Sequence, residues 1–111
     1  MTKTDDPSKY LPLSETTFYT MLCLAEEAMH GYALMQKVSE ISQGTVTLGA
    51  GTLYTIFSTL EREALIVMVS ESERRKTYAL TPRGRQVLQL QIQRLEIMAE
   101  HGRRVKALLS K

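Results

Sequence analysis

Cysteine and histidine are scarce in this 111-residue sequence, which has one Cys and two His. A lone cysteine can form neither an internal disulfide nor a cysteine-based zinc site within one chain, and the apolar neighbours of Cys23 are typical of a small buried hydrophobe. His30 and His101 lie far apart and lack the spacing of metal ligands. The sequence therefore predicts no metal and no cofactor. Because no nucleophile stands beside a base and an acid, it also predicts no enzyme.

Long hydrophobic runs are missing as well. No apolar segment approaches the roughly 20 residues that a membrane-spanning helix needs, and the first ten residues lack the apolar core of a signal peptide. The hydrophobic content of 43% and the charged content of 23% are ordinary for a folded domain. We expect one cytoplasmic domain without a membrane partner. It is small enough that burying further surface in a dimer would stabilise it.

Positive charge is sparse in the first part of the chain. Residues 1–65 hold four Lys or Arg against eight Asp or Glu, whereas residues 66–111 hold ten against four. Between Arg74 and Arg85 there are five cations and no acid. A local positive field of this kind attracts phosphate even though the net charge of the whole molecule is +2.

The periodicity of the sequence predicts helices first and a hairpin afterwards. Apolar residues at helical spacing predict three helices, over 14–29, 32–42 and 51–62. Two β-prone runs, 65–70 and 77–80, flank a polar tip and predict a hairpin. Three helices followed by a hairpin with a cationic tip is the order of a winged helix-turn-helix. We therefore expect a mainly α fold with a small β-hairpin.

A long C-terminal helix is expected beyond the hairpin. Thr81 and Pro82 form a strong helix start, as Ser14 does for the first helix, and no later proline interrupts the chain before Leu109. A helix of this length, about 40 Å, is too long to bury on so small a body. The expected division of the chain is a flexible arm over 1–12, a winged helix-turn-helix DNA-binding domain over 13–81 and a dimerisation helix over 82–111.

The expected third helix has two unlike faces. Its buried face is apolar and consists of Leu53, Ile56, Phe57, Leu60 and Ala64. Its other face is small and polar and consists of Thr52, Thr55, Ser58, Thr59 and Arg62. A polar face nearly free of charge suits close approach to base edges and phosphates. The plainer alternative is a solvated helix surface.

Apolar residues along the long helix predict a seam at coiled-coil spacing. The residues expected at a dimer interface or an effector pocket are Leu88, Ile92, Leu95, Met98 and Ala99. One side of the helix is expected to pack on the first helix of the same chain. The other side is expected to pack on a second copy across a two-fold axis.

Six short motifs stand in a fixed order between residues 30 and 90. They are His30-Gly31-Tyr32, Gly51-Thr52-Leu53-Tyr54, Leu60-Glu61, Arg74-Arg75-Lys76-Thr77-Tyr78, Leu80-Thr81 and Gly84. This ordered set resembles the PadR family of bacterial transcriptional regulators. The length and the single C-terminal helix are similar to the short subgroup of that family. The resemblance implies a homodimeric repressor with one winged-helix domain per subunit, and the two-fold symmetry of a dimer implies an inverted-repeat operator in double-stranded DNA.

The chain departs from the family pattern at the end of the third helix and at the hairpin tip. Ala64 stands where glycine commonly ends that helix, so we expect the end to turn less sharply. The tip lacks the usual glycines and carries Glu71 and Glu73, which phosphate would repel. The contact with DNA is therefore expected from the cations that follow these acids.

The residues expected to bind DNA come from two helices and the hairpin. They are Tyr32, Gly51, Thr52, Tyr54, Thr55, Ser58, Thr59, Arg62, Arg74, Arg75 and Lys76. For Tyr32 and Tyr54, packing inside the protein is an open alternative. The expected function is a sequence-specific DNA-binding homodimeric repressor. The alternative, favoured by the near-neutral charge and the acidic tip, is a winged-helix protein-interaction module without DNA binding.

The resemblance also bears on a small hydrophobic effector. Some members of the short subgroup admit planar hydrophobic drugs between the two long helices, stacked on a tryptophan. This chain has no Trp, and Leu95 occupies that position. An apolar cavity lined by Ile92, Leu95 and Met98 is one expectation. A tight apolar dimer interface without a ligand is the simpler alternative.

Overall fold

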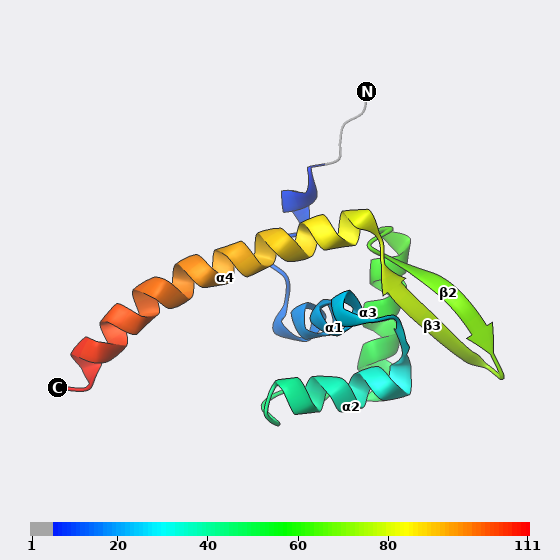
Figure 1. The fold of residues 1–111 in the computed structure, drawn as a ribbon, viewed down its shortest axis with the longest axis horizontal. Coiled ribbons are helices and arrows are strands. Elements are labelled where there is room, and N and C mark those ends of the chain that lie inside the picture. The colour runs from blue at the N-terminus through cyan, green and yellow to red at the C-terminus, as the bar shows by residue number, and fades with distance from the viewer. Residues whose placement is uncertain (1–5) are drawn as a thin grey trace.

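The computed structural model describes residues 6–111 of the chain. In chain order the elements are η1 (Pro7–Tyr10, a short 3-10 helix), α1 (Glu15–Glu26), β1 (Met29–His30), α2 (Gly31–Ile41), α3 (Ala50–Arg62), β2 (Ile66–Ser72), β3 (Arg75–Leu80) and α4 (Pro82–Leu109). Figure 1 shows β2 and β3 projecting from the helical body as a wing, while α4 runs away from it on the other side. The expected fold, mainly α with a small β-hairpin and a long last helix, is confirmed.

The three shorter α-helices enclose the core together with the base of the wing and the start of α4. Met21 on α1, Leu34 on α2 and Val87 on α4 are each fully buried. The expected apolar face of α3 is buried at Leu53, Ile56, Phe57 and Leu60, while Ala64 is exposed. Cys23 also lies in this core, and burial raises the pKa of its thiol to about 11. The thiol is therefore protonated at neutral pH and unreactive, as the sequence predicts.

The first helix ends three residues earlier than expected. α1 stops at Glu26, and Met29 and His30 form β1, which pairs antiparallel with Tyr78 and Thr77 of β3. The sheet therefore has three strands in the order β1-β3-β2, where the sequence predicted a two-stranded hairpin. Two residues are too few for any alternation of apolar and polar side chains to reveal a strand.

The end of α3 turns at Ala64, which has a φ of 63°. This is the left-handed conformation that glycine adopts most easily, so the expectation of a less sharp turn is wrong. Hydrogen bonds from the start of α4 stabilise this turn between α3 and β2. Thr81 donates its hydroxyl to the carbonyl of Ala64 at 2.7 Å and its N–H to the carbonyl of Leu65 at 3.1 Å.

The close approach of α4 to this corner requires a glycine. A Cβ at Gly84 would collide with the carbonyl oxygen of Leu65 and would lie 3.3 Å from Cδ2 of Leu80. The N–H of Gly84 donates to Oγ1 of Thr81 at 3.0 Å, which makes Thr81 the expected N-cap of α4. The same threonine therefore starts α4 and holds the end of α3.

Part of the segment expected to be a flexible arm packs against the body. Tyr10, at the end of η1, donates its hydroxyl to Oε1 of Glu63 at 3.1 Å. The hydroxyl accepts from Nη2 of Arg83 at 2.8 Å. These bonds link the N-terminal segment to the end of α3 and to the start of α4. The first five residues of the expected arm lie outside the described part of the chain.

The long helix α4 leaves the body after its first turns. Gly84, Val87, Leu88 and Gln91 are buried, whereas every residue from Glu96 to the C-terminus is exposed. Leu88, which we expected at the dimer seam, is packed in the core of its own chain at 4% exposure, because α4 still covers α1 at this position. Within residues 6–111 no helix combines the length and the hydropathy needed to cross a bilayer.

Candidate nucleic-acid interface

A groove of about 460 Å³ runs between α3, the start of α2 and the wing. Its lining residues are His30, Gly31, Tyr32, Met35, Ala50, Leu53, Tyr54, Phe57, Ser58, Glu61, Arg74, Arg75, Lys76 and Tyr78. Six of the residues expected to bind DNA are among them, although they come from three elements that are far apart in the sequence. The fold therefore brings six of the eleven expected residues together at this groove.

The floor of the groove is part of the core. The rings of Phe57 on α3 and Tyr78 on β3 lie 4.7 Å apart between centroids, and both side chains are buried. Burial raises the pKa of the Tyr78 hydroxyl above its usual value. A Cβ at Gly31 would lie 3.2 Å from Cδ2 of Leu53, so the start of α2 sits tightly against α3. These contacts fix the wing and α2 relative to α3.

The two tyrosines of the expected site stand at the surface. Tyr32 is 62% exposed and Tyr54 is 74% exposed, so neither packs in the core. Tyr32 lies on the first turn of α2, where its hydroxyl accepts from Nε2 of Gln36 at 3.2 Å. Both residues line the groove.

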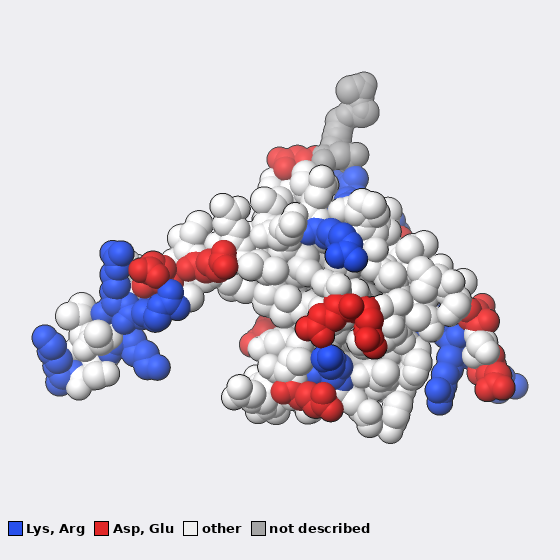
Figure 2. Space-filling view, viewed as in Figure 1, with Lys and Arg blue, Asp and Glu red and all other residues white. Residues whose placement is uncertain are grey.

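The wing brings three consecutive cations to the groove. The tip is a turn at Glu73 and Arg74, whose φ angles are 51° and 71°, and β3 begins at Arg75. The strands are thus longer than expected, and Arg75 and Lys76 belong to β3 instead of the tip. Arg74, Arg75 and Lys76 are all exposed and line the groove, whereas Glu73 is not among its lining residues. Figure 2 shows both basic and acidic residues on the wing, at the right of the view.

The polar face of α3 divides into two parts. Ser58 is half-buried and lines the groove. The remaining expected residues are exposed on α3 outside the groove lining, namely Gly51, Thr52, Thr55, Thr59 and Arg62. Thr55 donates its hydroxyl to the carbonyl of Gly51 at 3.2 Å, so its exposed oxygen is left with acceptor capacity. The face that points away from the body is therefore small and rich in hydroxyl groups, as expected.

Eight of the lining residues were not among the residues expected to bind DNA, and His30, Met35 and Glu61 are three of these eight. His30 caps α2, since its Nδ1 accepts from the N–H of Ala33 at 3.4 Å. Met35 lies on α2 one turn beyond Tyr32, and Glu61 lies on α3 one turn beyond Ser58. Helical spacing from Tyr32 and Ser58 could have found Met35 and Glu61. The packing of α2 and the wing against α3 could not be read from the sequence.

A second groove, of about 350 Å³, lies between α1 and α4. It is lined by Leu13, Glu15, Phe18, Tyr19, Gln91 and Leu95. The buried side chain of Gln91 accepts from the N–H of Leu13 at 3.1 Å and holds the entry of α1 against α4. Of the expected seam residues, Leu95 lines this groove, Ile92 packs on the core, and Met98 and Ala99 are exposed.

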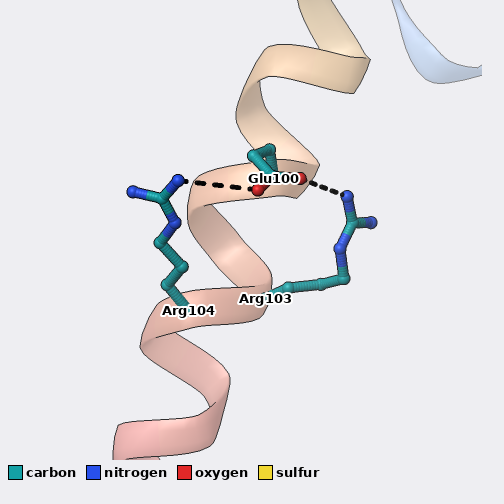
Figure 3. A network of polar contacts seen from close by, with 3 residues as sticks. All are labelled: Glu100, Arg103 and Arg104. Carbon is teal, nitrogen blue, oxygen red and sulfur yellow. Dashed lines mark hydrogen bonds and ion pairs between the residues drawn. The ribbon is translucent and has the colours of Figure 1, made fainter.

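A further group of cations lies on the distal part of α4. Figure 3 shows Arg103 and Arg104 on either side of Glu100, with N–O distances of 2.8 Å and 3.6 Å. All three side chains are exposed, so these ion pairs contribute little to stability. In the described residues no three His, Cys, Asp or Glu side chains converge as a metal site would require.

The fold and the groove define the class of protein. A three-helix body whose third helix lies beside a β-hairpin wing, with a long helix to follow, is a winged helix-turn-helix domain. The chain belongs to the Transcriptional regulator PadR-like family, whose model matches residues 20–90. Proteins of this family are DNA-binding transcription regulators and not enzymes.

Individual relatives agree with this assignment. The chain is 31% identical to the "Transcriptional regulator YqjI" of Escherichia coli (strain K12) over 84 residues, which cover 76% of this chain and 39% of that protein. A PadR family transcription regulator from Clostridium difficile R20291 has a TM-score of 0.73 and 22% identity, covering 83% of this chain and 98% of that one. A PadR-like transcription factor from Bacteroides fragilis has a TM-score of 0.68 and 24% identity, covering 81% and 88%. The chain thus spans about two fifths of the length of the curated relative YqjI.

Proposed function

We propose that the protein is a homodimeric repressor that binds an inverted-repeat operator in double-stranded DNA. In this proposal α3 enters the major groove and the wing lies along the phosphate backbone. The observation that carries it is the groove between α3 and the wing, where Tyr32 and Tyr54 face the same space as Arg74, Arg75 and Lys76. Hydroxyl donors and cations are the groups that bind phosphate oxygens.

The division of labour follows from the chemistry of the two parts. Arg74, Arg75 and Lys76 neutralise phosphates irrespective of sequence, so they supply general affinity that falls with salt. The outward face of α3 carries short side chains such as Thr55, which permit close approach to base edges. With Arg62 as the single cation on that face, α3 contributes discrimination more than attraction.

The first turn of α3 offers a further contact to phosphate. Its N-cap is Gly49, which provides no side-chain hydrogen bond, whereas Ser14, His30 and Thr81 cap the other α-helices of the described chain. The amides at the start of α3 can therefore meet an external acceptor. A helix N-terminus favours an anion through these N–H groups and through the helix dipole.

The homodimer is proposed from the distal part of α4. Ile97, Met98, Leu108 and Leu109 are between 55% and 78% exposed on a helix that has left its own body. Exposed large apolar side chains grouped on one element mark an interaction surface, and a second copy of the same helix is the simplest partner. A two-fold dimer would present two α3 helices to half-sites about 34 Å apart.

A small hydrophobic ligand between the two α4 helices is a second part of the proposal. Its support is the groove of about 350 Å³ that reaches Leu95, near the exposed Met98. Titration of the dimer with planar hydrophobic cations, followed by the melting temperature, tests this part. An increase that grows with concentration supports a pocket. No shift at saturating concentrations favours a closed apolar interface.

DNA binding is tested most simply with the DNA upstream of the protein's own gene. We expect a gel shift on this fragment whose affinity falls steeply between about 50 and 200 mM salt, as it does for proteins that neutralise several phosphates. A random fragment of equal length serves as the control and should bind more weakly. If no upstream fragment shows a salt-sensitive shift, the alternative of a protein-interaction module replaces the proposal.

A further inference from the structure

The groove between α3 and the wing is lined by one carboxylate, that of Glu61, and by three cations. Glu61 lies on the last full turn of α3, in the helical row of Tyr54 and Ser58 that lines the groove. Its side chain is exposed. Arg74, Arg75 and Lys76 approach the same space from the wing, so this groove is not uniformly positive.

The charge of Glu61 is not cancelled by an ion pair. The ion pairs found among residues 6–111 join Lys37 to Glu26 and two arginines to Glu100, and none includes Glu61. Glu61 and Lys76 nevertheless line the same groove, on either side of the buried Tyr78 ring of its floor. An anion that enters the groove toward the wing cations therefore also approaches the Glu61 carboxylate.

Resting on the proposed function, we infer that Glu61 is an affinity-limiting residue for duplex DNA, whose carboxylate opposes the phosphate backbone that the wing cations attract. The expected effect is electrostatic and independent of sequence. Two like charges at close range near a protein surface repel strongly enough to change affinity by a factor of several, and salt weakens this repulsion. Glu61 thus keeps the complex dissociable at low salt without reading a base.

The test compares Glu61→Gln with Glu40→Gln in the full chain. Both variants remove one negative charge from an exposed helical position, but Glu40 lies on α2 and does not line the groove. We expect Glu61→Gln to raise the affinity for an upstream duplex and for a random duplex by the same factor, about five- to tenfold at low salt. The plot of log affinity against log salt should become steeper by about 0.9. Glu40→Gln should change affinity less than twofold.

Several outcomes would overturn the inference. Equal effects of the two variants would show that Glu61 acts through net charge alone. Weaker binding by Glu61→Gln would mean that the carboxylate holds the wing cations in place. A change confined to the upstream duplex would make Glu61 a base-reading residue. If wild type itself shows no salt-sensitive binding to either duplex, the proposed function has failed instead.

A second measurement separates repulsion of phosphate from an interaction within the protein. In a Lys76→Ala background, Glu61→Gln should still raise affinity by a similar factor, because the repelled phosphate is still present. Loss of the effect in this background would show that Glu61 acts by holding Lys76, and would overturn the inference. Melting temperatures of all variants should lie close to that of wild type, since both side chains are exposed.

Discussion

The two halves of α4 are parts of one continuous helix with opposite surroundings. At its start Val87 is fully buried and Leu88 is 4% exposed. In its distal half Ile97 and Leu108 are each 66% exposed. Both halves contain apolar residues at helical spacing, so the pattern alone does not tell which half belongs to the core. The first turns of α4 therefore belong to the core, whereas its distal half is an exposed helix that carries large apolar side chains.

The Lys and Arg residues of the wing and of distal α4 also have different surroundings. Figure 2 shows Lys and Arg both along the wing and at the distal end of α4. On the wing, Arg74 and Arg75 line a groove beside exposed tyrosines. On α4, Arg103 and Arg104 are engaged by Glu100 (Figure 3). Positive charge by itself therefore does not identify a candidate DNA-binding site. The residues around the cations must be considered as well.

The largest expected effect on stability comes from adding one methyl group to α4, and it should differ between the two halves of the helix. Gly84→Ala should lower the free energy of unfolding by at least about 3 kcal/mol, because the new Cβ collides with the Leu65 carbonyl. Gly102→Ala is the matched control on the distal half, where a Cβ meets open space. It should raise stability by about 0.5–1 kcal/mol. Urea unfolding at equal protein concentration measures both, and a Gly84→Ala variant as stable as wild type would contradict the packing described.

The next effect concerns association without loss of the fold. Ile97→Glu combined with Leu108→Glu should weaken dimerisation by about 100-fold or more, because charge would be buried in an apolar contact. Sedimentation should show a monomer with an unchanged far-UV spectrum. Gln86→Glu adds a charge at an exposed position on the proximal half and should leave the dimer intact. A double variant that remains dimeric at micromolar concentration would remove the distal half from the interface.

A smaller effect is expected on the choice of DNA sequence. Thr55→Val or Ser58→Ala should change the ratio of affinities for operator and random duplex by about five- to thirtyfold, because side-chain contacts to base edges differ between sequences. General affinity, given by the random duplex, should change little. Ser110→Ala, at the exposed end of α4, is the control. If all variants keep the wild-type ratio in competition binding, the face of α3 that reads DNA has been misplaced.

The smallest effect is a gain in stability. Ala64→Gly should raise the free energy of unfolding by about 1 kcal/mol, because glycine adopts the left-handed conformation without the steric cost that Ala64 carries. The exposed methyl group of Ala64 makes little packing to lose. Thermal unfolding should show a higher midpoint. A lower midpoint would mean that the entropy of glycine in the unfolded chain outweighs the relief of strain.

Local chemistry explains which elements the sequence predicts well. Ser14 and Thr81 accept hydrogen bonds from the N–H groups of Thr17 and Gly84, so the two helix starts lie where their caps were predicted. α4 extends over Pro82–Leu109, as the absence of a later proline indicates. These features depend on neighbours in the chain, and a periodic pattern or a single capping residue is enough to reveal them.

Features that depend on distant residues were missed. β1 exists because Met29 and His30 meet β3, and two residues carry no pattern of their own. Ala64, with its φ of 63°, accepts a hydrogen bond at its carbonyl from the hydroxyl of Thr81, which is 17 residues away. Glu61 becomes a candidate site residue only because the fold places it in the same groove as the wing cations. The sequence supplies the members of the site, and tertiary packing decides which of them meet.

The central claim is that the wing, and not positive charge in general, holds the DNA backbone. Its most direct test measures the affinity for one upstream duplex at several salt concentrations, with two double variants. The wing variant combines Arg74→Ala and Arg75→Ala, and the α4 variant combines Arg103→Ala and Arg104→Ala. Both double variants lose two positive charges. We predict that the salt slope becomes shallower by about 0.9 for each lost phosphate contact in the wing variant and stays at the wild-type value in the α4 variant. An unchanged slope in the wing variant, or an equal loss in the α4 variant, would contradict the account.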